Sequence, residues 1–259
     1  MDDCLLERYS RHLLLPEIDL DGQKRLLNST AMLVGVGGLG SPVAAYLAAS
    51  GVGHLILNDH DRVDLGNLQR QVVHTTQDIN RPKVDSARDR LLALNPNIRI
   101  TTVGYQLAAP ELLQHVHLAD VVVDASDNFT TRYALNAACV SARVPLVWGA
   151  AIRFEGQATT FMNNQDHSPC LNCLYPRDID SESGQTCEDT GVFAPLPGII
   201  GSIMAAETLK ILLSLGSTLC GRLLQINSAE FDWRQSRLMR DPFCEICYGH
   251  SLLNHNQKT

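Results

Sequence analysis

The sequence predicts an α/β fold, with a doubly wound, Rossmann-like, mainly parallel sheet and an antiparallel extension at the C-terminal end. Three observations support this. Short apolar runs alternate with helical patterns through the first 150 residues, a glycine-rich turn follows the first run, and two Cys-x-x-Cys pairs stand in the second half. Alternating strands and helices are typical of parallel sheets, and two such cysteine pairs predict a zinc site that ties distant segments together.

The predicted parallel sheet consists of short apolar runs separated by helical patterns. Most of the runs are apolar almost throughout, as expected of strands buried on both faces, whereas residues 98–103 alternate. The predicted strands are Thr30–Val34, His54–Asn58, Ile98–Val103, Val121–Asp124 and Val144–Trp148. The predicted helices are Ser41–Ser50, Lys83–Ala93 and Thr130–Ala142. This order of elements predicts parallel strands joined by crossover helices.

The pattern changes after residue 150. Ala151–Met162 alternates apolar and polar residues, which predicts one strand of an antiparallel hairpin. Asn163–Thr190 is polar and too long for an ordinary connection, so we expect a functional or metal-bound loop. Ala194–Leu215 predicts an apolar core helix, and Arg222–Asn227 and Trp233–Met239 predict two final strands.

Composition and charge exclude several classes of partner. The chain has 259 residues, a net charge of −7 and only 5% aromatic residues, which disfavours nucleic acid and anionic membranes as partners. The start of the chain lacks the apolar core of a signal peptide. The charge-free stretch from Gly191 to Ala206 is shorter than the roughly 20 residues of a membrane span. We therefore expect a cytoplasmic protein.

A glycine-rich turn predicts a nucleotide site. Gly35, Gly37, Gly38 and Gly40 lie between a predicted strand and a predicted helix, where they allow a phosphate to approach the helix N-terminus. Asp59 ends the next strand, at the position where an acidic residue binds a ribose hydroxyl. By itself this combination fits an NAD enzyme as well as an ATP enzyme.

Polar residues downstream favour a triphosphate. Arg70 and Lys83 supply positive charge, with Asn67 as a polar neighbour, and such groups stabilise the charge that develops when a phosphate bond breaks. Asp127 and Asn128 follow the end of a buried strand, the edge at which open α/β sheets bind ligands. A carboxylate there can hold Mg²⁺, which prefers oxygen ligands and shares them with phosphates.

The two Cys-x-x-Cys pairs predict a structural metal centre. Cys170 and Cys173 form one pair, and Cys244 and Cys247 form the other. Four thiolates make a closed tetrahedral Zn²⁺ site with no open coordination position, so the metal would be structural rather than catalytic. The alternative from the residues alone is four free thiols.

Together these segments resemble the ubiquitin-activating-type superfamily and, within it, the HesA/MoeB/ThiF family. The likeness covers nearly the whole chain, and the combined motifs are specific although the glycine turn alone is not. The matching segments are Arg8–Arg11, Gly35–Gly40, Asp59, Asn67–Gln71, Pro82-Lys83, Asp127-Asn128, Gly149–Gln157 and Gly191–Lys210.

The resemblance implies an adenylyltransferase that uses ATP and Mg²⁺ and carries Zn²⁺. Its substrate would be the C-terminal Gly-Gly carboxylate of a small ubiquitin-like sulfur-carrier protein, activated as acyl-AMP. The implied carrier is the MoaD-type small subunit of molybdopterin synthase, in molybdenum cofactor biosynthesis. The same chemistry on a ThiS-type carrier of the thiamine pathway remains the alternative. A separate protein would donate the sulfur.

The resemblance also implies roles for single residues. Asp59 would bind the ribose and Asp127 the Mg²⁺, while Arg70 and Lys83 would bind the phosphates. Arg11 would reach into the ATP site of a second subunit, which implies a homodimer. The positions that would contact ATP are Gly38, Asp59, Asn67, Arg70, Lys83 and Asp127.

Cys187 matches a cysteine on a loop that, in the family, crosses over the carrier tail. In the thiamine branch this cysteine joins covalently to the carrier. The neighbouring Glu188 and Asp189 would raise its pKa, which weakens it as a nucleophile. Whether Cys187 forms such a bond stays open.

The implied organisation is a single domain with several regions: a helical arm in the dimer contact (1–28), an ATP-binding region (29–150), a carrier-binding and zinc region (151–249) and a tail (250–259). The glycine turn and the cysteine pairs are also found in two other functional classes. One is an NAD(P)-dependent oxidoreductase, which Arg70, Lys83 and Asp127 argue against. The other is a non-catalytic scaffold, or a zinc-dependent redox sensor, that holds nucleotide without turning it over.

Overall fold

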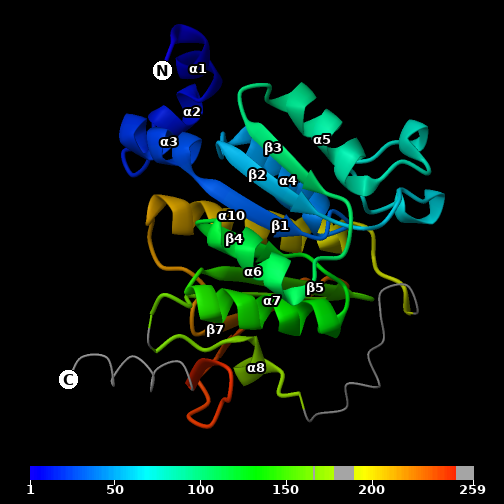
Figure 1. Cartoon of the computed structure of the whole chain (residues 1–259), viewed down its shortest axis with the longest axis vertical. Helices are drawn as coiled ribbons and strands as arrows, with labels where there is room; N and C mark the ends of the chain where they lie inside the picture. The colour runs from blue at the N-terminus through cyan, green and yellow to red at the C-terminus, as the bar shows by residue number, and fades with distance from the viewer. Residues whose placement is uncertain (166, 178–189, 249–259) are drawn as a thin grey trace.

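One eight-stranded sheet runs through the described residues in the order β3-β2-β1-β4-β5-β6-β7-β8 (Figure 1). The structure is a computed structural model that describes residues 1–165, 167–177 and 190–248. The parallel strands are β1 (Thr30–Val34), β2 (His54–Asn58), β3 (Arg99–Val103), β4 (Val121–Asp124) and β5 (Leu146–Ile152). The strand order reverses between β1 and β4, which creates a switch point where ligands bind in open α/β sheets.

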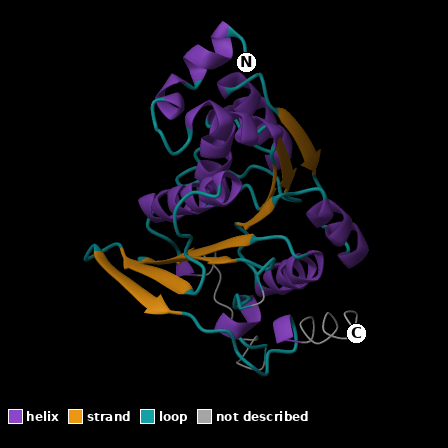
Figure 2. Cartoon of the chain, turned by 90° about the vertical axis from the view of Figure 1, so that its left-hand side faces the viewer, coloured by secondary structure: helices purple, strands orange, loops and turns teal. Residues whose placement is uncertain are grey.

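The last three strands are antiparallel: β6 (Glu155–Phe161), β7 (Arg222–Asn227) and β8 (Asp232–Arg237). They extend the sheet to one side (Figure 2). The expectation of one strand over 151–162 is wrong, because the chain reverses at Arg153 and Phe154, between paired Ile152 and Glu155. Arg153 takes the left-handed φ of +50° that tight hairpin turns favour. The alternation of apolar and polar residues continues through this short turn, so the sequence pattern does not reveal it.

Helices cover both faces of the sheet, so the fold is the predicted doubly wound one. One buried cluster lies under α3 (Asp19–Asn28), α4 (Gly40–Ala49), α5 (Lys83–Leu94) and α10 (Pro195–Leu213). The other lies under α6 (Ala109–His117), α7 (Phe129–Ala142) and α8 (Leu171–Leu174). The predictions did not include α6. The short helices are α1 (Asp3–Arg8), α2 (Ser10–Leu13), η1 (Leu65–Asn67) and η2 (Thr76–Asp78).

Among the described helices, α10 alone is long and apolar enough to cross a membrane, by length and composition. In the structure 56% of that apolar window is buried. The helix contacts α4, β5 and β6. Its buried Glu207 accepts hydrogen bonds from Thr160 Oγ1 (3.0 Å) and from the ammonium of Lys210. These contacts are those of a core helix, as the sequence predicted.

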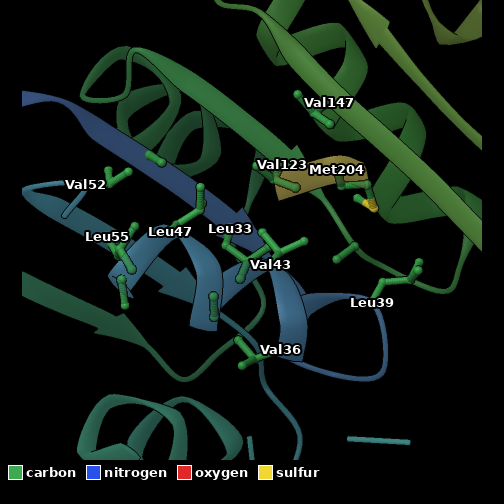
Figure 3. Close-up of a cluster of buried hydrophobic side chains, with 14 of the residues drawn as sticks. Leu33, Val36, Leu39, Val43, Leu47, Val52, Leu55, Val123, Val147 and Met204 are labelled. Carbon is green, nitrogen blue, oxygen red and sulfur yellow. The ribbon is translucent and has the colours of Figure 1, made fainter. Parts of the chain in front are cut away.

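The apolar core anchors the glycine turn. Val36 and Leu39 point from the turn into the cluster formed by Leu33 of β1, Val43 of α4 and Met204 of α10, among others (Figure 3). Fully burying one such side chain contributes about 1.5–3 kcal/mol. The backbone between them is therefore fixed by packing on both sides of the glycines.

Candidate functional site

A cavity of about 620 Å³ opens at the switch point between β1 and β4. A second hollow of about 540 Å³ shares Asp61, Arg70 and Lys83 with it and also contains Asn67. The structure thus brings most of the predicted ATP-site residues around one space, although they come from five separate segments. Those lining the larger cavity are Gly35, Gly37, Gly38, Asp59, Arg70, Lys83, Asp127 and Asn128.

The glycines of the turn have two different functions. Gly35 has a φ of +89°, and a Cβ there would lie 2.6 Å from the Ala125 carbonyl oxygen. A Cβ on Gly40 would lie 2.0 Å from the carbonyl oxygen of Gly35. Gly40 lines neither cavity, so it permits the turn to close rather than contacting a ligand. Gly37 and Gly38 line the cavity and leave room for a phosphate beside the backbone.

Asp59 is held in place by the turn that it faces. Its Oδ2 accepts a hydrogen bond from the Val36 N–H (2.7 Å), and its Oδ1 accepts one from the Asp61 N–H (2.9 Å). Side chains of Asp59, His60 and Asp61 lie close enough to bind a metal ion. However, Asp61 Oδ2 already pairs with Lys83 Nζ at 2.9 Å. This carboxylate pair therefore fits a ribose and an ammonium better than a metal.

Two cations line the wall next to Asp59. Lys83 is the first residue of α5, and its side chain is only 6% exposed. Arg70 donates from Nη2 to Asn67 Oδ1 at 2.9 Å, which orients the guanidinium. Because two positively charged side chains line both cavities, this wall suits a polyphosphate.

Asp127 lies on a loop whose conformation is held by buried groups at the end of β4. Asp124 ends β4 fully buried, and its Oδ1 accepts hydrogen bonds from the N–H (3.0 Å) and hydroxyl (2.6 Å) of Ser126. Burial raises the pKa of Asp124. Asn128 caps α7 by accepting from the Thr131 N–H at 2.9 Å, and it donates to Asp127 Oδ1 at 3.3 Å. The exposed Asp127 carboxylate keeps free lone pairs in the cavity, which fits a Mg²⁺ ligand.

Several lining residues were not predicted. Arg132 is buried, donates to the Ser126 carbonyl oxygen at 2.8 Å and lies 5.3 Å from the Phe129 ring centroid and 5.4 Å from that of Trp148. The only local signal was an arginine in the first turn of a helix that begins at a strand's carboxyl end. Gln71 lies in a predicted segment, but its burial and its unpaired Oε1 at the cavity come from the structure.

Arg153 and Glu155 fall within the expected strand Ala151–Met162. Instead, Arg153 lies in the hairpin turn, and its N–H donates to the Gly191 carbonyl oxygen at 2.9 Å. Glu155 lines the cavity and accepts from Asn227 Nδ2 at 2.8 Å. Both belong to the hairpin of β5 and β6, which lies between β4 and β7 and therefore not at an edge of the sheet.

Arg11 lies apart from the cavity of its own chain. It is an exposed residue of α2 and lines neither cavity. Within residues 1–165, 167–177 and 190–248 no hydrogen bond or ion pair engages its guanidinium. The arm is instead anchored at Tyr9, whose hydroxyl accepts from Asn95 Nδ2 at 2.9 Å. The Arg11 side chain is therefore available to another molecule.

The four paired cysteines meet, although 74 residues separate the two pairs. The Sγ–Sγ distances are 3.9 Å for Cys170–Cys173 and 3.6 Å for both Cys170–Cys244 and Cys173–Cys247. Four thiolates about 2.3 Å from a tetrahedral Zn²⁺ would be about 3.8 Å apart, so the donor set fits zinc. Hydrogen bonds from Cys170 and Cys247 lower the pKa of Cys173 to about 2. The predicted Cys187 lies outside the described residues.

Comparisons with known proteins agree with this geometry. A model described as the ThiF family matches residues 9–246. The chain is 44% identical over 247 residues to a molybdopterin-synthase adenylyltransferase of Escherichia coli K12, covering 95% of the chain and 98% of the relative. It is 42% identical to a sulfur carrier protein adenylyltransferase of Thermus thermophilus (93% and 90% covered). It is 41% identical to the ThiS adenylyltransferase of E. coli (96% and 98% covered).

Solved structures confirm the fold. The crystal structure of E. coli MccB with AMPCPP and MccA superposes with a TM-score of 0.80 at 24% identity, covering 93% of this chain and 74% of the other. The structure of PaaA gives a TM-score of 0.78 at 25% identity, covering 93% and 76%. The mixed sheet with its antiparallel end is thus shared across distant sequences.

Proposed function

Because the chain belongs to the ThiF family, we propose that it adenylates the C-terminal carboxylate of a small ubiquitin-like sulfur-carrier protein. The observation that carries the proposal is the convergence of Asp59, Lys83 and Asp127 on one cavity beside a glycine turn. Nearly full-length relatives named adenylyltransferases support the same chemistry. Fixed cations around the phosphate site argue against an NAD(P) enzyme, whose cofactor needs little positive charge there.

The reaction needs positioning and charge neutralisation more than proton transfer. The attacking carboxylate is already ionised at pH 7. Its oxygen forms a bond to the α-phosphorus, the bond between the α-phosphorus and the bridging oxygen breaks, and pyrophosphate leaves with the electron pair. The products are an acyl-adenylate and pyrophosphate. In-line orientation and stabilisation of the developing charge therefore supply the catalysis.

The predicted site residues that line the cavity each have a role in this reaction. Asp59 accepts from the ribose hydroxyls, while Arg70 and Lys83 neutralise the phosphates that leave. Asp127 would hold Mg²⁺, which when bound supplies further charge neutralisation. Gln71 Oε1 has no hydrogen-bond partner in the part of the chain that the structure describes, so it can accept a hydrogen bond at the same wall. We further propose a homodimer in which Arg11 completes the site of the second copy, since that exposed side chain has no hydrogen-bond or ion-pair partner among the described residues of its own subunit.

The zinc site is structural in this proposal. Cys170 and Cys173 would bind Zn²⁺ together with Cys244 and Cys247, and thereby tie the C-terminal strands and the residues after them to α8. A closed four-thiolate site leaves no coordination position for substrate. The metal therefore stabilises the carrier side of the domain without entering the reaction.

For the carrier we propose the MoaD-type small subunit of molybdopterin synthase, in molybdenum cofactor biosynthesis, with sulfur supplied by a separate protein. Support comes from the 44% identity to the adenylyltransferase named for that synthase. The relative named for ThiS is 41% identical and is the observation that favours the second candidate, a thiamine-pathway carrier.

Pyrophosphate exchange tests the function. The protein is incubated with ATP, Mg²⁺ and labelled pyrophosphate, and exchange into ATP is measured with each carrier. We expect exchange only with a carrier that ends in Gly-Gly, and a carrier truncated by that dipeptide is the control. Exchange without any carrier, or none with either carrier, would contradict the proposal. Mass spectrometry of the carrier then shows which one gains AMP.

The same experiment addresses Cys187. We expect Cys187→Ala to retain adenylate formation, because the carboxylate rather than the thiol attacks the phosphorus. A carrier adduct that forms in the wild type and is lost in this variant would indicate the thiamine-type route. Complete loss of exchange would instead assign Cys187 to the first step.

A further inference from the structure

His74 is a buried histidine that the reaction outlined above does not use. It follows η1, is 5% exposed and lines neither cavity. Its Nε2 lies 3.0 Å from the Val36 carbonyl oxygen, and its Nδ1 lies 2.8 Å from Ser86 Oγ. Val36 belongs to the glycine turn, and Ser86 lies one helical turn after Lys83 on α5. The imidazole thus joins two segments, the glycine turn and the start of α5, that both line the larger cavity.

The hydrogen-bonding roles follow from the partners. The Val36 carbonyl oxygen can only accept, so Nε2 carries the proton and donates it. Nδ1 lies within hydrogen-bond distance of the Ser86 hydroxyl, which also interacts with the Asp78 carboxylate. Both ring nitrogens therefore have a partner, and an apolar side chain of the same size would satisfy neither the Val36 carbonyl oxygen nor the Ser86 hydroxyl.

This contact completes a closed chain of interactions. Asp59 binds the Val36 N–H at 2.7 Å and the Asp61 N–H at 2.9 Å. Asp61 binds the Lys83 ammonium at 2.9 Å, and its backbone carbonyl oxygen accepts from the Lys83 N–H at 2.9 Å. Lys83 and Ser86 share the first turn of α5, and His74 leads back to Val36. Asp59, the predicted ribose ligand, and Lys83, the predicted phosphate ligand, are therefore held relative to each other by this closed chain of interactions.

We propose that His74 is a positioning residue for adenylate formation: it holds the glycine turn and the start of α5 at the separation that the triphosphate requires. The inference rests on the proposed function. Without the imidazole, the Val36 carbonyl oxygen loses its link to Ser86 of α5, and only the path from the Val36 N–H through Asp59 and Asp61 to Lys83 remains. A displacement of about 1 Å in a reacting assembly can lower the rate roughly a hundredfold.

The test compares four variants of the full chain in carrier-dependent exchange. His74→Leu removes both hydrogen bonds, whereas His74→Gln retains a donor that can reach the Val36 carbonyl oxygen. Ser86→Ala removes the other hydrogen bond of His74 and so breaks the closed chain of interactions at α5. His54→Leu is the matched control, because His54 binds Thr101 and Arg99 at the start of β2, outside both cavities. Circular dichroism and thermal unfolding establish that each variant is folded at the assay temperature.

We expect His74→Leu to lower kcat about a hundredfold and to change the KM for ATP much less, since the ring aligns the transition state. His74→Gln should recover much of this loss, Ser86→Ala should lower kcat less strongly, and His54→Leu should match the wild type. An unchanged kcat in His74→Leu, or equal losses in the Leu and Gln variants, overturns the proposal. If His74→Leu is unfolded, a wild-type kcat in Ser86→Ala overturns it.

The exchange assay distinguishes a wrong proposed function from a wrong positioning role for His74. If the wild type shows no exchange with any carrier, the proposed function is wrong and the role of His74 falls with it. If the wild type exchanges normally and the His74 variants do as well, the proposed function stands and only the positioning role is wrong.

Discussion

The ammonium of Lys83 lies 2.9 Å from Asp61 Oδ2, with the lysine side chain 6% exposed and the aspartate side chain 49% exposed. The cation is therefore withdrawn from solvent, while its counter-ion stays hydrated. A phosphate that enters the cavity competes with Asp61 for the same ammonium. The pair holds the Lys83 ammonium in one orientation before ATP arrives.

Replacing Lys83 tests this arrangement. Lys83→Met removes the charge and keeps most of the apolar stem, so we expect the kcat of carrier-dependent exchange to fall about 10²–10³-fold. Lys24→Met is the control, because among the described residues Lys24 pairs only with exposed Asp21, at 3.4 Å. Retention of more than half of the wild-type kcat in Lys83→Met would contradict a role for this ammonium.

The shared-site model predicts complementation between two inactive variants. Arg11→Ala removes the group given to the neighbouring subunit, and Asp127→Ala removes the predicted Mg²⁺ ligand of a subunit's own site. A mixed dimer has one site that lacks both groups and one that has both, so we expect part of the activity to return on mixing. Exchange assays on mixtures measure this, and native mass spectrometry confirms that mixed dimers form. Mixed dimers without activity would rule the model out.

The cysteine cluster predicts bound zinc. We expect about one Zn²⁺ per four-thiolate site, measured by elemental analysis, and almost none in Cys244→Ser. Because metal binding energy contributes to folding energy, the variant and chelated wild type should unfold at lower temperature. Cys220→Ser is the control, since its sulfur lies 3.5 Å from Ser168 Oγ and outside the cluster. Full zinc content in Cys244→Ser would show that the zinc is bound at another site.

The burial of His74 predicts how stability depends on pH. Burial lowers the pKa of His74 from 6.5, and Lys83 lowers it further, while the Val36 carbonyl, Asp59 and Asp78 act in the opposite direction. The unfolded chain therefore takes up this proton first as pH falls, and stability present above about pH 6.5 is lost below it. The contribution is at most about 1.4 kcal/mol per pH unit.

We expect His74→Gln to show a shallower decline of unfolding free energy with acidification than the wild type, measured by urea denaturation at several pH values. His54→Gln serves as the comparison, because burial and Arg99 also lower the pKa of the less buried His54. Parallel curves for the wild type and His74→Gln would mean that His74 has the same pKa in the folded and unfolded states.

Local chemistry explains which parts of the fold were predictable. The turn from Gly35 to Gly40, the strand Val121–Asp124 and the start of α5 at Lys83 lie where their sequence signals place them. Turn geometry, continuous apolar runs and a preceding proline act within a few residues. By contrast, α6 has only 9 residues, and the hairpin turn at Arg153 keeps the alternation of both strands.

The site was predictable as a set of residues but not as an arrangement. Asp59, Lys83 and Asp127 each stand beside a recognisable strand end or turn. The contacts of Arg132 with Trp148 and of Tyr175 with Gln157 (2.7 Å) join residues on different elements, which no local pattern specifies. The ring through His74 depends in the same way on tertiary packing.

The close approach of Gly40 to Gly35 leaves the turn almost no alternative conformation, and Val36 and Leu39 lock it into the core. The ligand therefore meets a receptor already in its final shape, and little ordering entropy is spent on the protein when the nucleotide docks. That cost falls instead on the second reactant, whose flexible end must lose its freedom to reach the phosphorus. Differences in rate between carriers should then reflect how readily each one immobilises its own terminus.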